Sequence, residues 1–265
     1  MPLLHRTPGL FEALKGEMTP KFLATRNTEG VPNVVPVISI LPEDEQSDTL
    51  FFGNFLLRKS IKNLEEDHRV GILVITQELQ GWILKGDFLE FQRTGSYVDR
   101  QMSSSLLRYN AYTGIRTAGI IRARSVEGSF RISKLQVAKD YLLARLASLS
   151  GGAIGDEGVT MPLPVRHEFK KMAAVKVLAW VEEDGYPVVV PALSLQPARA
   201  ESLICWKGTQ FPEPKQGALV ASNILTLEAI SYQVKGRWVR AGKTGSVQVQ
   251  EVYAGGPPLP GGRLA

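Results

Sequence analysis

The sequence predicts a mainly β protein with small helices, built from two tandem barrels of antiparallel strands. Three observations support this prediction. Two ordered blocks of sequence recur at nearly the same separation, most apolar runs have the length of a strand and lie between turn residues, and the helical patterns are few. At 265 residues, with 44% hydrophobic and 22% charged residues, the chain is long enough for two domains of ordinary size.

The internal repeat is the strongest organisational feature of the chain. The segment KFLATRNTEGVPNVVPVISI (21–40) resembles KVLAWVEEDGYPVVVPALSL (176–195), at an offset of 176 − 21 = 155 residues. Further on, LKGDFLEFQRTGS (84–96) matches VKGRWVRAGKTGS (234–246), at an offset of 234 − 84 = 150 residues. A repeat of this length is much too long for a solenoid, so each copy is expected to be a domain.

The repeat divides the chain into copy one, residues 1–150, and copy two, residues 151–265. The junction SLSGGAIGDEGVTMPLP is rich in Gly and Pro and is typical of a linker. Before it, residues 132–149 carry apolar side chains at helical spacing, and an amphipathic insertion is expected at 97–112. About six antiparallel strands in copy one suit a closed or split barrel, and they are expected at 22–26, 33–41, 49–54, 69–76, 82–92 and 115–124.

A short basic helix is expected after the third of these strands, in GNFLLRKSIKNLEED (53–67). Its apolar residues recur at i, i+4 and i+7 and form one stripe. Arg58 and Lys59 stand at the start of this helix, where the backbone dipole is already positive. Cations at this position are favourable if a bound anion completes the site, and phosphate is the common biological anion there.

The side chains near this helix start suit a phosphate monoester. Arginine offers a bidentate fork and lysine a mobile charge, Ser60 adds a hydroxyl group, and Asn54 or Asn63 could donate an amide. The alternative is an ordinary solvated helix face, in which Lys62 and Glu66 form an i,i+4 ion pair.

Copy two lacks this helix. DTLFFG pairs with ESLICW, which aligns Gly53 with Trp206, and ILVIT (72–76) pairs with ALVAS (218–222). Between these anchors copy one has 72 − 53 = 19 steps and copy two 218 − 206 = 12. In place of the helix stands KGTQFPEPKQG, whose two prolines prevent a helix of any length. A helix needed only for stability should be needed by both copies, so the loss favours a ligand-binding role.

The ordered set GVPNVVPV, DTLFFGNF, RKSIKNLEEDHRVGILV and KG in the next strand resembles the FMN-binding split barrel of the pyridoxamine 5′-phosphate oxidase-like superfamily. The resemblance covers most of residues 10–125 and, more loosely, 165–254. It implies two tandem split barrels of antiparallel Greek-key type, which form an internal pseudo-dimer with FMN in the crevice between them. The cofactor-binding residues expected by resemblance and by helix-start chemistry are Val35, Pro36, Val37, Phe52, Gly53, Asn54, Arg58, Lys59, Ser60 and Asn63.

The departures from the family pattern narrow the expected function. True pyridoxamine phosphate oxidases carry basic residues in the second strand, whereas Val34–Ile40 has none, and the C-terminus lacks the expected ending. The sequence is closer to small FMN-binding and flavin-reductase-like members. It therefore implies an FMN-dependent oxidoreductase or flavin electron carrier with a small-molecule redox partner and no identifiable catalytic residue. Aromatic residues of copy two that could face the ring, or pack in the core, are Trp206, Tyr232, Trp238 and Tyr253.

Other functions remain as alternatives. The same scaffold also accommodates deazaflavin and haem, so the main alternative is a non-catalytic module that binds another cofactor or a partner. Haem usually needs an axial histidine, and His68 is the histidine nearest the proposed site. A net charge of +5 and a pI near 9.3 suggest a nucleic-acid-binding barrel, but no basic and aromatic strand face supports it.

The remaining expectations concern redox state, location and assembly. Cys205 is the only cysteine and is expected to be buried and inert, and the three scattered histidines do not predict a metal site. With no recognisable export signal or membrane-spanning run, we expect a cytoplasmic protein. A homodimer on top of the internal pseudo-dimer is an open alternative.

Overall fold

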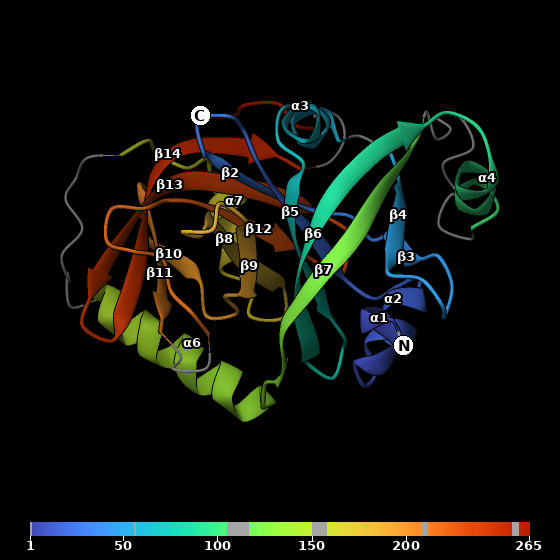
Figure 1. The fold of residues 1–265 in the computed structure, drawn as a ribbon. Coiled ribbons are helices and arrows are strands. Elements are labelled where there is room, and N and C mark those ends of the chain that lie inside the picture. The colour runs from blue at the N-terminus through green and yellow to red at the C-terminus, as the bar shows by residue number, and fades with distance from the viewer. Residues whose placement is uncertain (1, 56, 105–116, 150–157, 208–210, 256–259) are drawn as a thin grey trace.

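The computed structural model describes the chain except for residues 1, 56, 105–116, 150–157, 208–210 and 256–259. Its strands form two seven-stranded sheets that lie side by side (Figure 1), and all paired strands are antiparallel. The strands of copy one are β1 (Lys21–Arg26), β2 (Pro32–Pro36), β3 (Leu41–Pro42), β4 (Thr49–Gly53), β5 (Arg69–Ile75), β6 (Gln80–Gln92) and β7 (Ala118–Arg131).

Copy two repeats the topology of copy one. The first sheet has the order β2-β1-β5-β6-β7-β4-β3, and the second, read in the matching direction, has β9-β8-β12-β13-β14-β11-β10. Each copy-two strand therefore takes the place of its counterpart, and the predicted mainly β fold of two tandem split barrels is confirmed. The strands of copy two are β8 (Val175–Val181), β9 (Pro187–Pro191), β10 (Gln196–Arg199), β11 (Ser202–Trp206), β12 (Leu219–Leu225), β13 (Ser231–Ala241) and β14 (Thr244–Ala254).

Most of the helices lie around the outside of the two sheets, whereas α7 lies near the centre of the view (Figure 1). The longest, α6, follows β7 and packs along β10 and β11, so the helix that closes copy one covers copy two. No helix in the described part of the chain is long and apolar enough to span a membrane. The helices are α1 (Leu3–Arg6), α2 (Leu10–Lys15), α3 (Arg58–Glu66), α4 (Ser96–Met102), α6 (Lys134–Leu149) and α7 (Leu163–Phe169).

One predicted strand is wrong, because the stretch 33–41 is split in two. The Val37 N–H still donates to Lys21 O, but the Ile40 N–H then donates to Val37 O and closes a turn before β3. Copy two has the same break, where the Leu195 N–H donates to Ala192 O. Within the described residues, each copy therefore has seven strands rather than about six. The first part of the expected insertion 97–112 forms α4, which ends at Met102. Residues 105–112 and the boundary at 150/151 lie outside the described residues.

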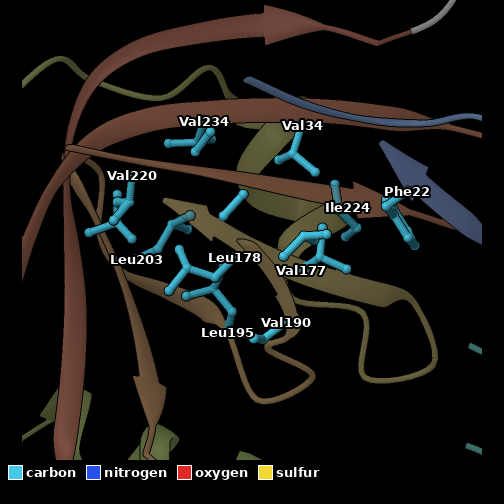
Figure 2. Close-up of a cluster of buried hydrophobic side chains, with 14 of the residues drawn as sticks. Phe22, Val34, Val177, Leu178, Val190, Leu195, Leu203, Val220, Ile224 and Val234 are labelled. Carbon is cyan, nitrogen blue, oxygen red and sulfur yellow. The ribbon is translucent and has the colours of Figure 1, made fainter. Parts of the chain in front are cut away.

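The two copies pack together like the subunits of a symmetric dimer. β2 packs against β12 and β5 against β9, where β12 is the counterpart of β5 and β9 that of β2. Figure 2 shows the shared core, in which Phe22 and Val34 of copy one lie beside Ile224 of copy two. The approach is close at Gly71, where a Cβ atom would stand 2.2 Å from the Pro187 carbonyl oxygen. This self-complementary contact is what an isologous interface requires.

Polar contacts also join the copies at their edge. Lys85 Nζ lies 2.7 Å from carboxylate oxygens of both Glu182 and Asp184, and the Tyr186 hydroxyl donates to Asp87 at 2.8 Å. Burial lowers the pKa of Lys85, but the hydrogen bonds to Asp184 and Glu182 outweigh it and raise that pKa above its ordinary value. Lys85 thus has a structural role between the domains.

Candidate cofactor site between the two copies

Helix α3 is fastened to copy one by two buried side-chain hydrogen bonds. Asn33 Nδ2 on β2 donates to Ser60 Oγ at 3.1 Å, and Asn63 Nδ2 donates to Thr25 Oγ1 on β1 at 3.0 Å. These bonds fix the start of the helix beside the end of β2. Leu57 precedes the first helical residue and makes no side-chain cap, and the first turn holds no acidic residue. The first N–H groups of α3 therefore have no intrahelical acceptor and can meet an anion.

A cavity of about 200 Å³ opens at this helix start, and both copies line it. Copy one contributes the end of β2 and the start of α3, while copy two contributes β13, the end of β14 and the segment after it. The site is therefore shared across the pseudo-dimer interface. The residues that line it are Asn33, Val35, Pro36, Phe55, Leu57, Arg58, Lys59, Ser60, Ala229, Gln233, Tyr253, Ala254, Gly255 and Gly261.

Half of the predicted cofactor residues line this cavity, namely Val35, Pro36, Arg58, Lys59 and Ser60. The other five lie outside it. Val37 follows the end of β2 and is buried with Phe52 in the copy-one core. The backbone N–H of Gly53 donates to Ser39 Oγ, Asn54 Nδ2 donates to Thr117 Oγ1, and the Asn63 amide is engaged by Thr25. Their polar groups hold the barrel together here.

Tyr253 is the centre of a cationic cluster. Lys59 Nζ lies 3.2 Å from the centre of its ring, and Lys235 Nζ lies 5.9 Å from the same point. Burial lowers the pKa of Lys59, and burial together with the Lys59 charge lowers the pKa of Lys235 to about 8. Burial and a hydrogen bond to Glu251 raise the pKa of the Tyr253 hydroxyl to about 12. Because these cations repel one another, an anion bound beside them would be stabilised.

Sequence reasoning missed two polar residues of the site, Asn33 and Gln233. Gln233 Nε2 donates to the Val34 carbonyl oxygen across the interface at 2.6 Å. Asn33 is 1% exposed, and its Oδ1 has no hydrogen-bond partner within the described residues. By the repeat offsets, Asn33 aligns with Val188 and Gln233 with Ile83. In both cases a polar residue in one copy aligns with an apolar residue in the other. This difference between aligned positions could have identified Asn33 and Gln233 from the sequence.

The other residues singled out in the sequence can now be placed. Of the four aromatic residues proposed to face the ring, Tyr253 lines the cavity and Trp206, Tyr232 and Trp238 do not. The His68 side chain is 63% exposed, lies 3.7 Å from Asp87 and is not part of the cavity. Cys205 is buried, and burial raises the pKa of its thiol to about 12, so it is inert as expected.

The donor set fits a phosphate monoester. Arg58, Lys59, the free helix N–H groups and the Ser60 hydroxyl supply charge and hydrogen bonds. The cavity is smaller than the roughly 300–1,000 Å³ usual for sites that enclose small molecules, so it would enclose the phosphate end and leave the rest of a nucleotide along Val35 and Pro36. Lys59 now rests on the Tyr253 ring and would have to turn toward the phosphate.

The chain matches no protein-family model and no curated protein. Among solved structures, it is similar to an FMN-binding protein from Syntrophomonas wolfei subsp. wolfei (15% identity, 50% of this chain and 88% of that chain, TM-score 0.40). It is also similar to HutZ, the heme storage protein from Vibrio cholerae (17%, 49% and 95%, TM-score 0.34). The inhibitor of motility MotI/DgrA from Bacillus subtilis aligns over 89% of this chain and 90% of its own (7%, TM-score 0.25).

Proposed function

We propose that this chain is an FMN-binding flavoprotein that acts as an oxidoreductase or flavin electron carrier. Copy one holds the phosphate through Arg58, Lys59 and Ser60, and copy two closes the pocket with Gln233 and Tyr253. The observation that carries the proposal is the position of α3. This helix, which copy two lacks, presents its cations to a cavity that both copies line.

Each residue has a separate task in this proposal. The Arg58 guanidinium would bind two phosphate oxygens, and the Lys59 ammonium would add a third contact after leaving the Tyr253 ring. Val35, Pro36 and the uncovered face of Tyr253 would then offer apolar surface to the flavin ring. The bound flavin would supply the redox chemistry, exchanging hydride or electrons with a small-molecule partner. A cytoplasmic location is part of the proposal.

Deazaflavin and haem are the competing cofactors. A haem protein usually needs an axial histidine, and His68 lies outside the cavity, exposed and beside Asp87. The absorption spectrum of the purified protein, with and without added FMN, separates these cofactors because each has its own bands. A protein that is colourless and takes up no FMN would contradict the proposal.

The phosphate assignment is tested by the double substitution Arg58→Ala and Lys59→Ala. Losing two charge-assisted contacts should weaken FMN binding by about 3 kcal/mol, or roughly 150-fold, in a fluorescence titration. Riboflavin, which lacks the phosphate, should bind the variant and the unaltered protein equally. The matched control is Lys62→Ala, on the same helix but with a side chain 76% exposed, and it should leave FMN affinity unchanged. An unchanged FMN affinity in the double variant would overturn the assignment.

A further inference from the structure

A second cavity, of about 430 Å³, lies on the face of the copy-two sheet, and it too is lined by both copies. It lies between β9, β11 and the first half of α6. Val190 and Pro191 line it, and by the offset of 155 these residues are the counterparts of Val35 and Pro36 in the candidate cofactor site. The cavity is therefore the pseudo-symmetric counterpart of that site, and its volume falls within the range of small-molecule pockets.

The second cavity has no counterpart of the phosphate-binding residues. Phe211 and Pro212 stand where copy one has the start of α3, and the Phe211 ring packs edge-on against Phe130 with 4.9 Å between ring centres. A ligand of this cavity would therefore lack the phosphate grip that copy one offers.

The charges around the second cavity cancel. Arg131 and Lys207 line it together with Asp140 and Glu213, two cations and two anions. Lys207 Nζ lies 3.1 Å from a Glu213 carboxylate oxygen, so this pair neutralises itself. A balanced lining favours an uncharged ligand, because either sign of charge would meet repulsion as well as attraction.

The floor of the second cavity is apolar and aromatic. Leu178, Val190 and Trp238 are buried, and Trp206 and Phe211 add two further rings. Trp238 is 2% exposed, and its indole N–H has no hydrogen-bond partner within the described residues. That nitrogen is itself shielded from solvent, so Trp238 offers a ligand ring surface rather than a hydrogen bond. Aromatic walls select flat rings.

We propose that copy two binds an uncharged, planar aromatic molecule of about two or three fused rings, packed against Trp206, Phe211 and Trp238. This site does not depend on FMN binding in copy one. The fused chain would then hold two different ligands at pseudo-symmetric positions, one bound through its phosphate and one through shape and aromatic packing.

Lumichrome, which is planar, uncharged and fluorescent, is the probe for this test. Titration of the full chain should give saturable lumichrome binding, of which one equivalent per chain remains when excess FMN fills the copy-one site. Ala192→Trp, which fills the copy-two cavity from β9's end, should weaken lumichrome binding at least tenfold. The matched control is Val35→Trp, which fills the copy-one cavity and should leave lumichrome binding intact.

A second variant keeps the test decisive if Ala192→Trp does not fold. Trp206→Ala removes one of the aromatic rings that line the cavity, and it should weaken lumichrome binding about tenfold, which corresponds to about 1.4 kcal/mol. The proposal is overturned if lumichrome does not bind saturably, if Val35→Trp abolishes its binding, or if neither copy-two substitution changes its affinity. Failure of FMN to bind would leave these results unaffected, so the two proposals fail separately.

Discussion

The two copies share one strand order but differ after their fourth strands, β4 and β11 (Figure 1). Copy one continues into α3 with Arg58 and Lys59, whereas copy two continues into a segment that contains Phe211 and Pro212. In a symmetric dimer each subunit must hold one ligand and close the site of the other. A fused chain is free of that constraint, so one copy can keep the binding element while the other keeps only the interface.

Buried lysines show the same divergence. Lys21 and Lys176 occupy equivalent positions, and both are fully buried. Lys21 Nζ donates to the Gly16 and Ile38 carbonyl oxygens, and burial lowers its pKa to about 8. Lys176 Nζ has no hydrogen-bond partner in the described part of the chain and lies 5.2 Å from the centre of the Tyr141 ring; burial lowers its pKa to about 7. Copy two has kept this cation without its acceptors.

The largest expected effect comes from Lys176→Met, which removes that cation. Because the folded-state pKa lies below the ordinary value of 10.5, the unfolded state binds more protons between about pH 7 and 10.5. The unaltered protein should therefore become more stable as the pH rises through this window. The variant should be more stable at pH 7 by on the order of 3 kcal/mol and lose most of this pH dependence, as measured by urea unfolding.

The counterpart substitution sharpens this comparison. Lys21→Met also removes a buried cation, but it leaves the Gly16 and Ile38 carbonyl oxygens without their donor. The two effects oppose each other, so the gain at pH 7 should be clearly smaller than for Lys176→Met. An equal increase in the free energy of unfolding from both substitutions would contradict the difference between the two buried lysines.

Much of the fold could be predicted because it follows from local sequence patterns and because the repeat shows each pattern twice. The offsets of 155 and 150 located both barrels, and Pro212 and Pro214 revealed where α3 was lost. Comparing the copies also identified Arg58 and Lys59, whose cavity the structure describes. These features depend on residues close together in the chain or on the comparison of the two copies. One sequence is therefore enough to predict them.

The remainder depends on contacts between distant segments. Val37 belongs to an unbroken apolar run, and only the hydrogen bond from the Ile40 N–H shows that the strand has already ended. Lys59 and Tyr253 are far apart in the chain, and their contact exists only because the copies pack face to face. The same holds for α6, whose apolar spacing predicted a helix but not that it covers β10 and β11.

The second largest effect is expected at the interface, for Gly71→Ala. A Cβ atom there would stand 2.2 Å from the Pro187 carbonyl oxygen, and backbone cannot yield as a flexible side chain can. Overpacking of this kind should lower the free energy of unfolding by about 2 kcal/mol. In copy two, Ala221 pairs with Lys235 as Gly71 pairs with Lys85, so an alanine is native there. Ala221→Gly should cost only about 1 kcal/mol, through backbone entropy.

A smaller effect should separate the recurring lysines Lys85 and Lys235. Lys85→Met removes the ion pairs to Glu182 and Asp184, which are partly exposed, and should cost about 1 kcal/mol in thermal or urea unfolding. Lys235 is 9% exposed and lies near Lys59, which repels it, so Lys235→Met should not destabilise the protein. If Lys235→Met destabilised the protein as much as Lys85→Met, the two lysines would not differ in structural role, contrary to this prediction.

The smallest effect is expected for Lys62→Ala, which tests whether the cations of α3 differ in role. The Lys62 side chain is 76% exposed and lies 3.6 Å from Glu66, an i,i+4 pair worth about 0.3 kcal/mol. Loss of this ion pair should lower the urea midpoint of unfolding only slightly, and the difference should disappear at high salt because salt screens the pair. If Lys62→Ala instead weakened FMN binding as much as Arg58→Ala does, the general positive field of α3 would attract the ligand. A contact at the helix start would then be excluded, and the contrast with copy two would concern net charge rather than geometry.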